Sequence, residues 1–208
     1  MEIIVATGNQ GKLREFREIL TDWEVSSMAE KGVHADAEET GTTFAENALI
    51  KAQALAAALR ERNMEAIAIS DDSGLEIDAF GGAPGVYSAR YLGHDTPYDV
   101  KNRIILNRLA DTPDEKRTAR YVAAIAAVMP DGTVLHSHGT VEGIIGWKSE
   151  GSGGFGYDPI FFVPEFGKSM ALLSPDEKNS ISHRGRALRE MLPKIRSWLE
   201  MNGRTADT

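Results

Sequence analysis

The chain contains no cysteine among its 208 residues. Disulfide bonds, iron–sulfur clusters, thiolate zinc sites and cysteine nucleophiles are therefore excluded. Cationic residues are also in the minority, because 23 Lys and Arg stand against 31 Asp and Glu, a net charge of −8. This balance argues against sequence-independent binding to DNA or RNA. An anionic ligand would have to be held by a few local cations and not by the field of the whole protein.

Long apolar runs are missing too. The strongest run, residues 121–129, is far shorter than the roughly 20 residues that a membrane-spanning helix needs. The first residues show no basic region and no cleavage site, which predicts that no signal peptide is present. We therefore expect a cytoplasmic protein with no membrane partner.

What the chain does contain is typical of one globular domain, with 42% hydrophobic and 26% charged residues. Apolar runs that favour strands alternate with stretches of helical periodicity. Pro130-Asp131-Gly132, between two such runs, predicts an antiparallel hairpin. We expect an α/β fold with a mixed sheet. The expected strands are 2–6, 23–27, 66–69, 75–78, 120–129, 133–141 and 160–163, and the expected helices are 13–20, 44–59, 98–109 and 182–199.

Four local features complete this expectation. Thr42 and Thr43 are placed to cap the helix that begins at residue 44, and Glu46 lies in its first turn, where the helix dipole favours an acid. Residues 71–74 are expected to separate the short strands 66–69 and 75–78. Pro193 should kink or restart the last helix. Residues 201–208 form a polar, frayed tail.

The first candidate for chemistry is TGNQGK at residues 7–12, between a predicted strand and a predicted helix. Glycine lets the backbone approach a ligand, and the free N–H groups of a helix start attract anions. Lys12 adds a positive charge. The spacing matches neither the Walker pattern nor the dinucleotide pattern, so an ordinary structural turn is an equally good interpretation.

Asp71 and Asp72 form the second candidate, just after an apolar run. Ligands of α/β sheets bind at the carboxyl ends of strands, and Mg²⁺ prefers one or two carboxylates together with substrate phosphates. Glu38 or Glu39 could supply another acid. The alternative is an Asp-rich turn, which explains one of the two aspartates more easily than both.

Two further segments carry polar and aromatic groups. The glycine-rich loop at 153–159 could line a base pocket, although its composition alone favours a structural loop. Lys178 and the segment 182–186 form a cationic cluster at a helix start, where the helix dipole disfavours cations.

A serine hydrolase is disfavoured because the G-x-S-x-G motif is absent. His136 with His138 is only a weak signal for a zinc site.

Five segments in this order resemble the inosine triphosphate pyrophosphatase family, the XTP/dITP diphosphatases. They are ATGNQGK at 6–12, EETGTTFAENA at 38–48, SDDSGLEIDAFGGAPGVYSARY at 70–91, GSGGFGYDPIFF at 151–162 and SHRGRAL at 182–188. Each motif is weak alone, but five with these intervals are specific, and they run nearly end to end.

The resemblance implies an elongated α/β fold, with a mixed central β-sheet, flanking helices and two lobes around a nucleotide cleft. It implies a single domain at 1–200, a homodimer and Mg²⁺ as cofactor. It also implies hydrolysis of ITP, dITP and XTP to the nucleoside monophosphate and pyrophosphate. Two alternatives stay open, a related pyrophosphatase for modified pyrimidine triphosphates and a nucleotide-binding regulatory module without turnover.

The resemblance also assigns residues. Asp72 would be the catalytic acid/base and a metal ligand, with Glu39 preferred over Glu38 as the second ligand. The triphosphate and the rest of the nucleotide would be bound by Thr7, Gly8, Asn9, Gln10, Gly11, Lys12, Ser73, Phe155, Gly156, Tyr157, Asp158, Lys178, His183 and Arg184.

Overall fold

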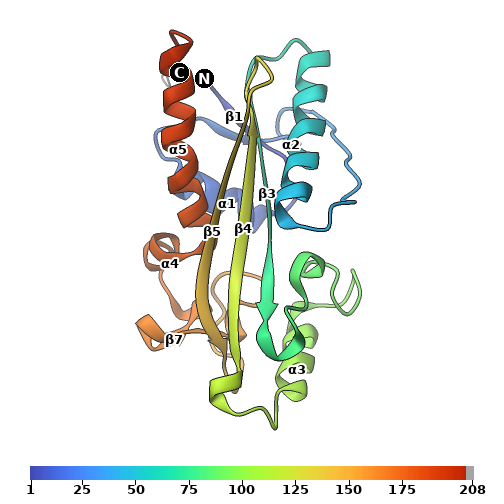
Figure 1. Cartoon of the computed structure of the whole chain (residues 1–208), viewed down its shortest axis with the longest axis vertical. Helices are drawn as coiled ribbons and strands as arrows, with labels where there is room; N and C mark the ends of the chain where they lie inside the picture. The colour runs from blue at the N-terminus through green and yellow to red at the C-terminus, as the bar shows by residue number, and fades with distance from the viewer. Residues whose placement is uncertain (205–208) are drawn as a thin grey trace. The chain divides into compact units, whose positions relative to one another are not determined.

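The structure, a computed structural model, describes residues 1–204 (Figure 1). Short 3₁₀ turns join the longer elements. The strands are β1 (Ile3–Val5), β2 (Val25–Ser27), β3 (Ile67–Ile77), β4 (Thr118–Val128), β5 (Val134–Ile145), β6 (Phe161–Val163) and β7 (Lys168–Ser169). The helices are α1 (Gln10–Ile19), α2 (Phe44–Glu61), α3 (Tyr98–Arg108), α4 (Pro175–Ile181) and α5 (His183–Met201).

The described strands form one sheet in the order β2-β1-β3-β4-β5-β6-β7. β1 pairs in parallel with both β2 and β3, whereas β6 pairs antiparallel with β5 and β7. β4 and β5 are neighbours joined by a tight turn, in which Met129 N–H donates to the Thr133 carbonyl oxygen at 2.8 Å. The expected α/β fold with a mixed sheet and a hairpin at 130–132 is therefore confirmed.

The chain divides into two compact units. The first contains 1–72, 123–139 and the residues from 183 on, and the second contains 73–122 and 140–182. A single two-lobed domain at 1–200 stays a prediction. The predicted tail lies only partly within the structure, since α5 ends at Met201 and residues 205–208 are outside the described part.

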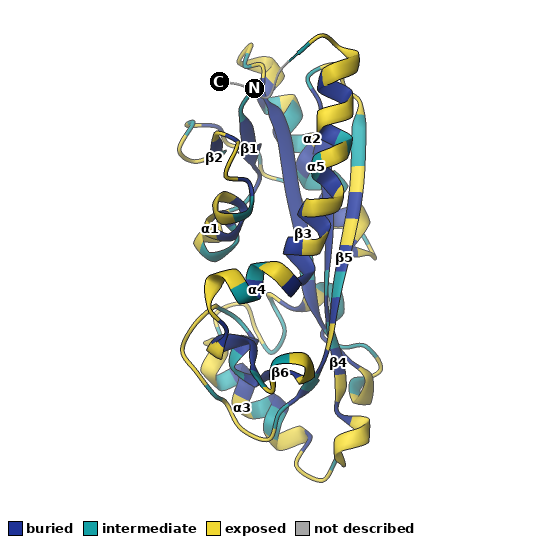
Figure 2. Cartoon of the chain, turned by 90° about the vertical axis from the view of Figure 1, so that its left-hand side faces the viewer, coloured by how far each residue is buried: buried dark blue, intermediate teal, exposed yellow. Residues whose placement is uncertain are grey.

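Strand alternation gives the sheet of the first unit two apolar faces. α1 and α5 cover one face, and α2 lies on the other side of the strands (Figure 1). Burying apolar surface on both faces makes β3 almost wholly inaccessible, as Figure 2 shows. The core on the side of α1 and α5 includes Ile3, Val5, Leu13, Phe16, Ile67, Ile69, Ile125, Leu188, Met191 and Trp198.

α5 approaches β5 closely at Gly139. A Cβ atom at this position would lie 2.1 Å from the carbonyl oxygen of His183, so only glycine fits. Farther along α5, Glu190 accepts the His138 backbone N–H at 3.2 Å, and Lys194 donates to the His136 carbonyl oxygen at 2.6 Å. These contacts fix the start of α5, where two of the predicted site residues lie.

The second unit has its own core, into which β4, β5 and β6 contribute together with α3. Its buried residues include Leu75, Ile77, Ile105, Tyr121, Val141 and Phe161. The rings of Tyr121 and Phe161 pack with centroids 4.7 Å apart. This core supports the loop at 153–159.

One local expectation was wrong, because β3 runs without a break from Ile67 to Ile77 and residues 71–74 do not interrupt it. Pro193 lies inside α5, so the helix does not restart there, and a kink stays a prediction. α4 was missed, although Ser174 and Glu177 form a capping box around Pro175 that marks its start. The predicted cap of α2 is confirmed at Thr43, which forms a capping box with Glu46.

No helix in the described part of the chain has the length and apolar character needed to cross a membrane.

Candidate active site

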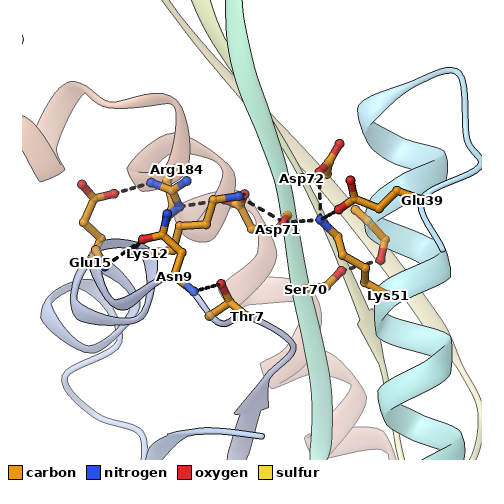
Figure 3. A network of polar contacts seen from close by, with 12 residues as sticks. Thr7, Asn9, Lys12, Glu15, Glu39, Lys51, Ser70, Asp71, Asp72 and Arg184 are labelled. Atoms are coloured by element: carbon orange, nitrogen blue, oxygen red, sulfur yellow. Dashed lines mark hydrogen bonds and ion pairs between the residues drawn. The ribbon is translucent and has the colours of Figure 1, made fainter. Parts of the chain in front are cut away.

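Asp71 and Asp72 point to opposite faces of the sheet (Figure 3). Because β3 continues through this segment, successive side chains alternate between its two faces. Asp71 lies toward α1 and α5, and Asp72 lies toward α2. The two neighbouring aspartates therefore do not form one pair of carboxylates, and each has its own set of partners.

Asp71 is enclosed by cations. Its Oδ1 lies 2.9 Å from Lys12 Nζ, and its Oδ2 lies 2.7 Å from Arg184 Nε. Arg184 in turn pairs with the buried carboxylate of Glu15 (Figure 3). Burial favours the neutral acid, but Arg184 and Lys12 outweigh it and hold the pKa of Asp71 far below its usual value. Asp71 is therefore a permanently ionised anchor for two cations and a poor proton acceptor.

Asp72 has a different environment. Its Oδ1 lies 2.8 Å from Lys51 Nζ, whereas its Oδ2 is buried with no hydrogen-bond partner among the described residues. Only 7% of the residue is exposed. Burial raises the pKa of Asp72 above its usual value, although the Lys51 ammonium opposes the shift. A buried carboxylate oxygen without a partner is costly in an apolar setting, so a proton, a water molecule or a cation would satisfy it.

Lys51 links Asp72 to Glu39. Its Nζ lies 2.9 Å from Glu39 Oε1 and 3.0 Å from the carbonyl oxygen of Asp71, so three acceptors match its three N–H donors. Burial lowers the pKa of Lys51, but the two carboxylates outweigh burial and leave it raised. Glu38, in contrast, is exposed. The structure thus brings Glu39, and not Glu38, to the carboxylate of Asp72.

Two carboxylates that contact the same ammonium group lie close enough together to suit a hard cation. Residues 1–204 contain no group of three or more His, Asp or Glu side chains that could hold a metal, which gives the pair His136 and His138 no support as a zinc site. Mg²⁺ commonly binds one or two carboxylates and takes its remaining ligands from water and phosphate. Asp72 and Glu39 fit that requirement, and the unpartnered Oδ2 of Asp72 is the specific acceptor available.

The segment before α1 presents polar backbone at a helix start. Asn9 caps the helix, accepting from the N–H groups of Gly11 at 2.8 Å and Lys12 at 3.1 Å, and its own N–H donates to Thr7 Oγ1. Gly8 and Gln10 are exposed, and a Cβ at Gly8 would meet nothing within 4 Å. The surrounding protein does not require glycine at position 8, which favours close approach of an external group.

The loop of the second unit gathers Phe155, Asp158 and Lys178. Asp158 Oδ2 accepts from the Phe155 N–H at 2.8 Å and from Lys178 Nζ at 2.7 Å, and that Nζ lies 4.8 Å from the centre of the Phe155 ring. Tyr157 instead points into the core and donates to the Ser88 carbonyl oxygen at 2.7 Å. The loop is therefore partly structural, as its composition suggested, and partly a cluster of charge beside an aromatic ring.

The predicted site residues thus fall into two groups, each within one unit. The first unit holds Thr7, Gly8, Asn9, Gln10, Gly11, Lys12, Glu39, Asp72, His183 and Arg184, and the second holds Ser73, Phe155, Gly156, Tyr157, Asp158 and Lys178. In this structure the guanidinium of Arg184 is committed to Glu15 and Asp71, so its predicted contact with a nucleotide stays a prediction.

The sequence analysis missed Glu15 and Lys51. Lys51 had a signal, because it is the one cation between residues 44 and 59 and lies in a helix whose neighbours are mostly apolar. Glu15 had a weaker one, since it lies three residues after Lys12 on the same helix and is buried despite its charge. Neither signal identifies the partner of the residue.

Replacing Lys51 by Gln should shift the acidic limb of the activity profile. Asp72 would lose the ammonium that favours its ionised form, so its pKa would rise further, and the acid form would persist to higher pH. We expect the acidic limb of log(kcat/KM) against pH to move to higher pH. An unchanged profile, with Arg60→Gln in the last turn of α2 as control, would show that Lys51 does not act on the ionisation of Asp72.

Comparisons with known proteins extend along nearly the whole chain. A model of the Ham1 family matches residues 3–194. The chain is 44% identical over 201 residues to a dITP/XTP pyrophosphatase from Exiguobacterium sibiricum, covering 96% of this chain and 99% of that protein. It is 47% identical over 201 residues to a dITP/XTP pyrophosphatase from Bacillus cereus, covering 95% and 96%.

A solved structure agrees with these sequence matches. A HAM1 protein from Coxiella burnetii has a TM-score of 0.81 at 40% identity, with 95% of this chain and 99% of that chain covered. The resemblance drawn from five motifs is thereby confirmed, and so is the α/β class of the fold. The chain belongs to the Ham1 family.

Proposed function

We propose that this chain hydrolyses deaminated purine nucleoside triphosphates, ITP, dITP and XTP, to the nucleoside monophosphate and pyrophosphate, and so removes them from the nucleotide pool. Relatives named dITP/XTP pyrophosphatase match it over nearly their full length. The observation in the site that carries the proposal is the buried Asp72 carboxylate, with one oxygen on Lys51 and the other unpartnered.

A triphosphate brings several negative charges to a protein that is itself at −8. Local cations and the positive end of the α1 dipole must offset this repulsion. Lys12 is the cation at that helix start, and Lys178 is a second cation in the other unit. Burial lowers the pKa of Lys12, an effect that an arriving phosphate anion would oppose.

Asp72 is the residue suited to act on water. Its carboxylate would orient a water molecule and accept its proton as the water attacks the α-phosphorus, with pyrophosphate as the leaving group. Phosphoryl transfer depends on positioning and electrostatics more than on covalent catalysis, which agrees with a chain that has no cysteine and no nucleophile elbow. Lys51 would keep Asp72 oriented through the reaction.

Asp72 and Glu39 would hold the metal, which we take to be Mg²⁺. When bound, this ion would withdraw charge from the phosphates and acidify coordinated water. Glu39 and Asp72 contact the same Lys51 Nζ at 2.9 Å and 2.8 Å, so the two carboxylates lie near enough to share a cation.

Selection of the base has a simple requirement. Hypoxanthine and xanthine present an O6 acceptor and an N1–H donor, whereas adenine presents the reverse pattern. A site whose buried donors and acceptors match the first pattern leaves them unpaired against adenine and can discriminate by about 10⁴–10⁵. Phe155 would stack on the base, while Asp158 as acceptor and Lys178 as donor would read its edge.

The products of the reaction test this proposal. With ITP and Mg²⁺, we expect inosine monophosphate and pyrophosphate in equal amounts, with no orthophosphate, and loss of turnover when EDTA removes the metal. Orthophosphate alone would reject attack at the α-phosphorus. Turnover of modified pyrimidine triphosphates above that of dITP would favour the related pyrimidine enzyme. Binding of ITP without turnover would favour the regulatory module.

Two further implications of the resemblance, a homodimer and a cytoplasmic location, stay predictions.

A further inference from the structure

One buried polar side chain of the second unit has no part in the chemistry described so far. Asn102, on α3, is 3% exposed. Its Nδ2 donates to the carbonyl oxygen of Gly156 at 3.2 Å, and its Oδ1 is buried without a hydrogen-bond partner among the described residues. A buried amide with one unsatisfied group is less favourable than an apolar side chain of similar size, unless its remaining bond is needed.

The bond of Asn102 acts on the loop that carries Phe155 and Asp158. Gly154 and Gly156 both have a φ of 69°, a left-handed conformation that favours glycine. A Cβ at Gly154 would lie 2.0 Å from Asp158 Oδ2, so the backbone wraps tightly around that carboxylate. A loop built from such residues gains much freedom when its anchors are removed.

Two groups of contacts hold the part of the loop from Phe155 to Asp158, and the Gly153 N–H also donates to the Ala171 carbonyl oxygen at 3.1 Å. On one side Asp158 is fixed by Lys178 and by the Phe155 N–H. On the other side α3 supplies two groups one turn apart, Tyr98 and Asn102. The Tyr98 ring meets the Tyr157 ring edge to face at 5.1 Å, and Asn102 holds the adjacent Gly156 carbonyl.

α3 is itself tied down beside the loop. The buried Lys101 donates to the carbonyl oxygen of Ala89 at 2.8 Å, and the Tyr157 hydroxyl donates to the neighbouring Ser88 carbonyl oxygen. The helix and the loop thus bind the same short segment, so the loop is held in advance of any ligand. Such preorganisation lowers the ordering cost of binding.

We propose that Asn102 is a positioning residue that holds the 153–158 loop in its base-binding form, and so contributes to affinity for the nucleobase and not for the phosphates. The proposal rests on the proposed function, in which Phe155 and Asp158 contact the base. Asn102 acts through the Gly156 carbonyl, one residue from Phe155 and two from Asp158.

Asn102→Leu tests the proposal, because leucine fills a similar volume and cannot donate. Asn107→Leu is the matched control, the same change at an exposed position of the same helix. Two probes separate the ends of the substrate: inosine monophosphate carries the base, and tripolyphosphate carries only phosphates. We expect Asn102→Leu to raise the Kd for inosine monophosphate and the KM for ITP about tenfold, the loss of about one hydrogen bond. Inhibition by tripolyphosphate and kcat should change less than about twofold.

Two results would overturn the inference. One is a folded Asn102→Leu variant that binds inosine monophosphate as the wild type does. The other is equal weakening for inosine monophosphate and tripolyphosphate, which a general loss of structure would produce. If the variant does not fold, Tyr98→Leu decides, because Tyr98 is 39% exposed and contacts the same loop. Weaker inosine monophosphate binding supports the proposal, and unchanged binding rejects it.

A failure of the proposed function can be told apart from a failure of the inference on Asn102. A wild-type protein that binds inosine monophosphate without hydrolysing ITP would contradict the function, while the titrations with inosine monophosphate would still decide the role of Asn102.

Discussion

Asp72→Asn should lower kcat for ITP hydrolysis by about 10³-fold or more, since it removes the proposed general base and a metal ligand together. Asparagine keeps the shape of the side chain, and its carbonyl oxygen can still accept from Lys51, which also retains Glu39 and the Asp71 carbonyl. The buried charge of Asp72 is itself unfavourable, as its raised pKa indicates. We therefore expect Tm to change by only a few degrees.

Measurement of turnover and of thermal unfolding on one preparation checks both parts. Near-normal turnover in Asp72→Asn would place the base elsewhere, with Asp71 as the remaining neighbour. A large fall in Tm would mean that Asp72 is mainly a structural partner of Lys51. The matched variant is Asp71→Asn, one residue away on the opposite face of the same strand.

Asp71→Asn should differ from Asp72→Asn in its effect on stability. We expect a large loss of folding stability. It removes the carboxylate between Lys12 and Arg184, and the amide N–H₂ group would then face one of these cations. Breaking a buried ion pair by removing one partner costs about 3–5 kcal/mol. For a chain of this length, each kcal/mol lowers Tm by roughly 2–4 °C. We expect Tm to fall by roughly 6 °C or more, measured by circular dichroism.

The stability that Asp71→Asn removes should depend on pH in a defined direction. The pKa of Asp71 is lowered on folding, so its contribution to stability is present above the unfolded value of about 3.9 and is lost as the pH falls toward the folded value. The difference in Tm between wild type and Asp71→Asn should therefore be constant from about pH 8 to 5 and shrink below about pH 4. A difference that grows on acidification would contradict the ion-pair assignment.

Local signals predicted much of this protein well. The cap at Thr43, the hairpin at 130–132 and the helix that follows Asn9 depend on neighbours within a few residues. The motif order also fixed the family. Short-range rules failed at 71–74, where two acids and a glycine resembled a turn, because the cations that neutralise those acids lie far away in the sequence.

The sequence by itself determined which chemical groups are available: Asp72 and Glu39 as acids, Lys12 at a helix start, and a glycine loop with Phe155 and Asp158. Only the tertiary structure decided how Asp71 and Asp72 differ. Adjacent side chains of a strand point to opposite faces of the sheet. The residues that they contact on each face come from other elements. Arg184 lies 113 residues from Asp71, and Lys51 lies 21 residues from Asp72. Burial of these distant charges beside the strand fixed one aspartate between two cations and left the other with one oxygen unpartnered.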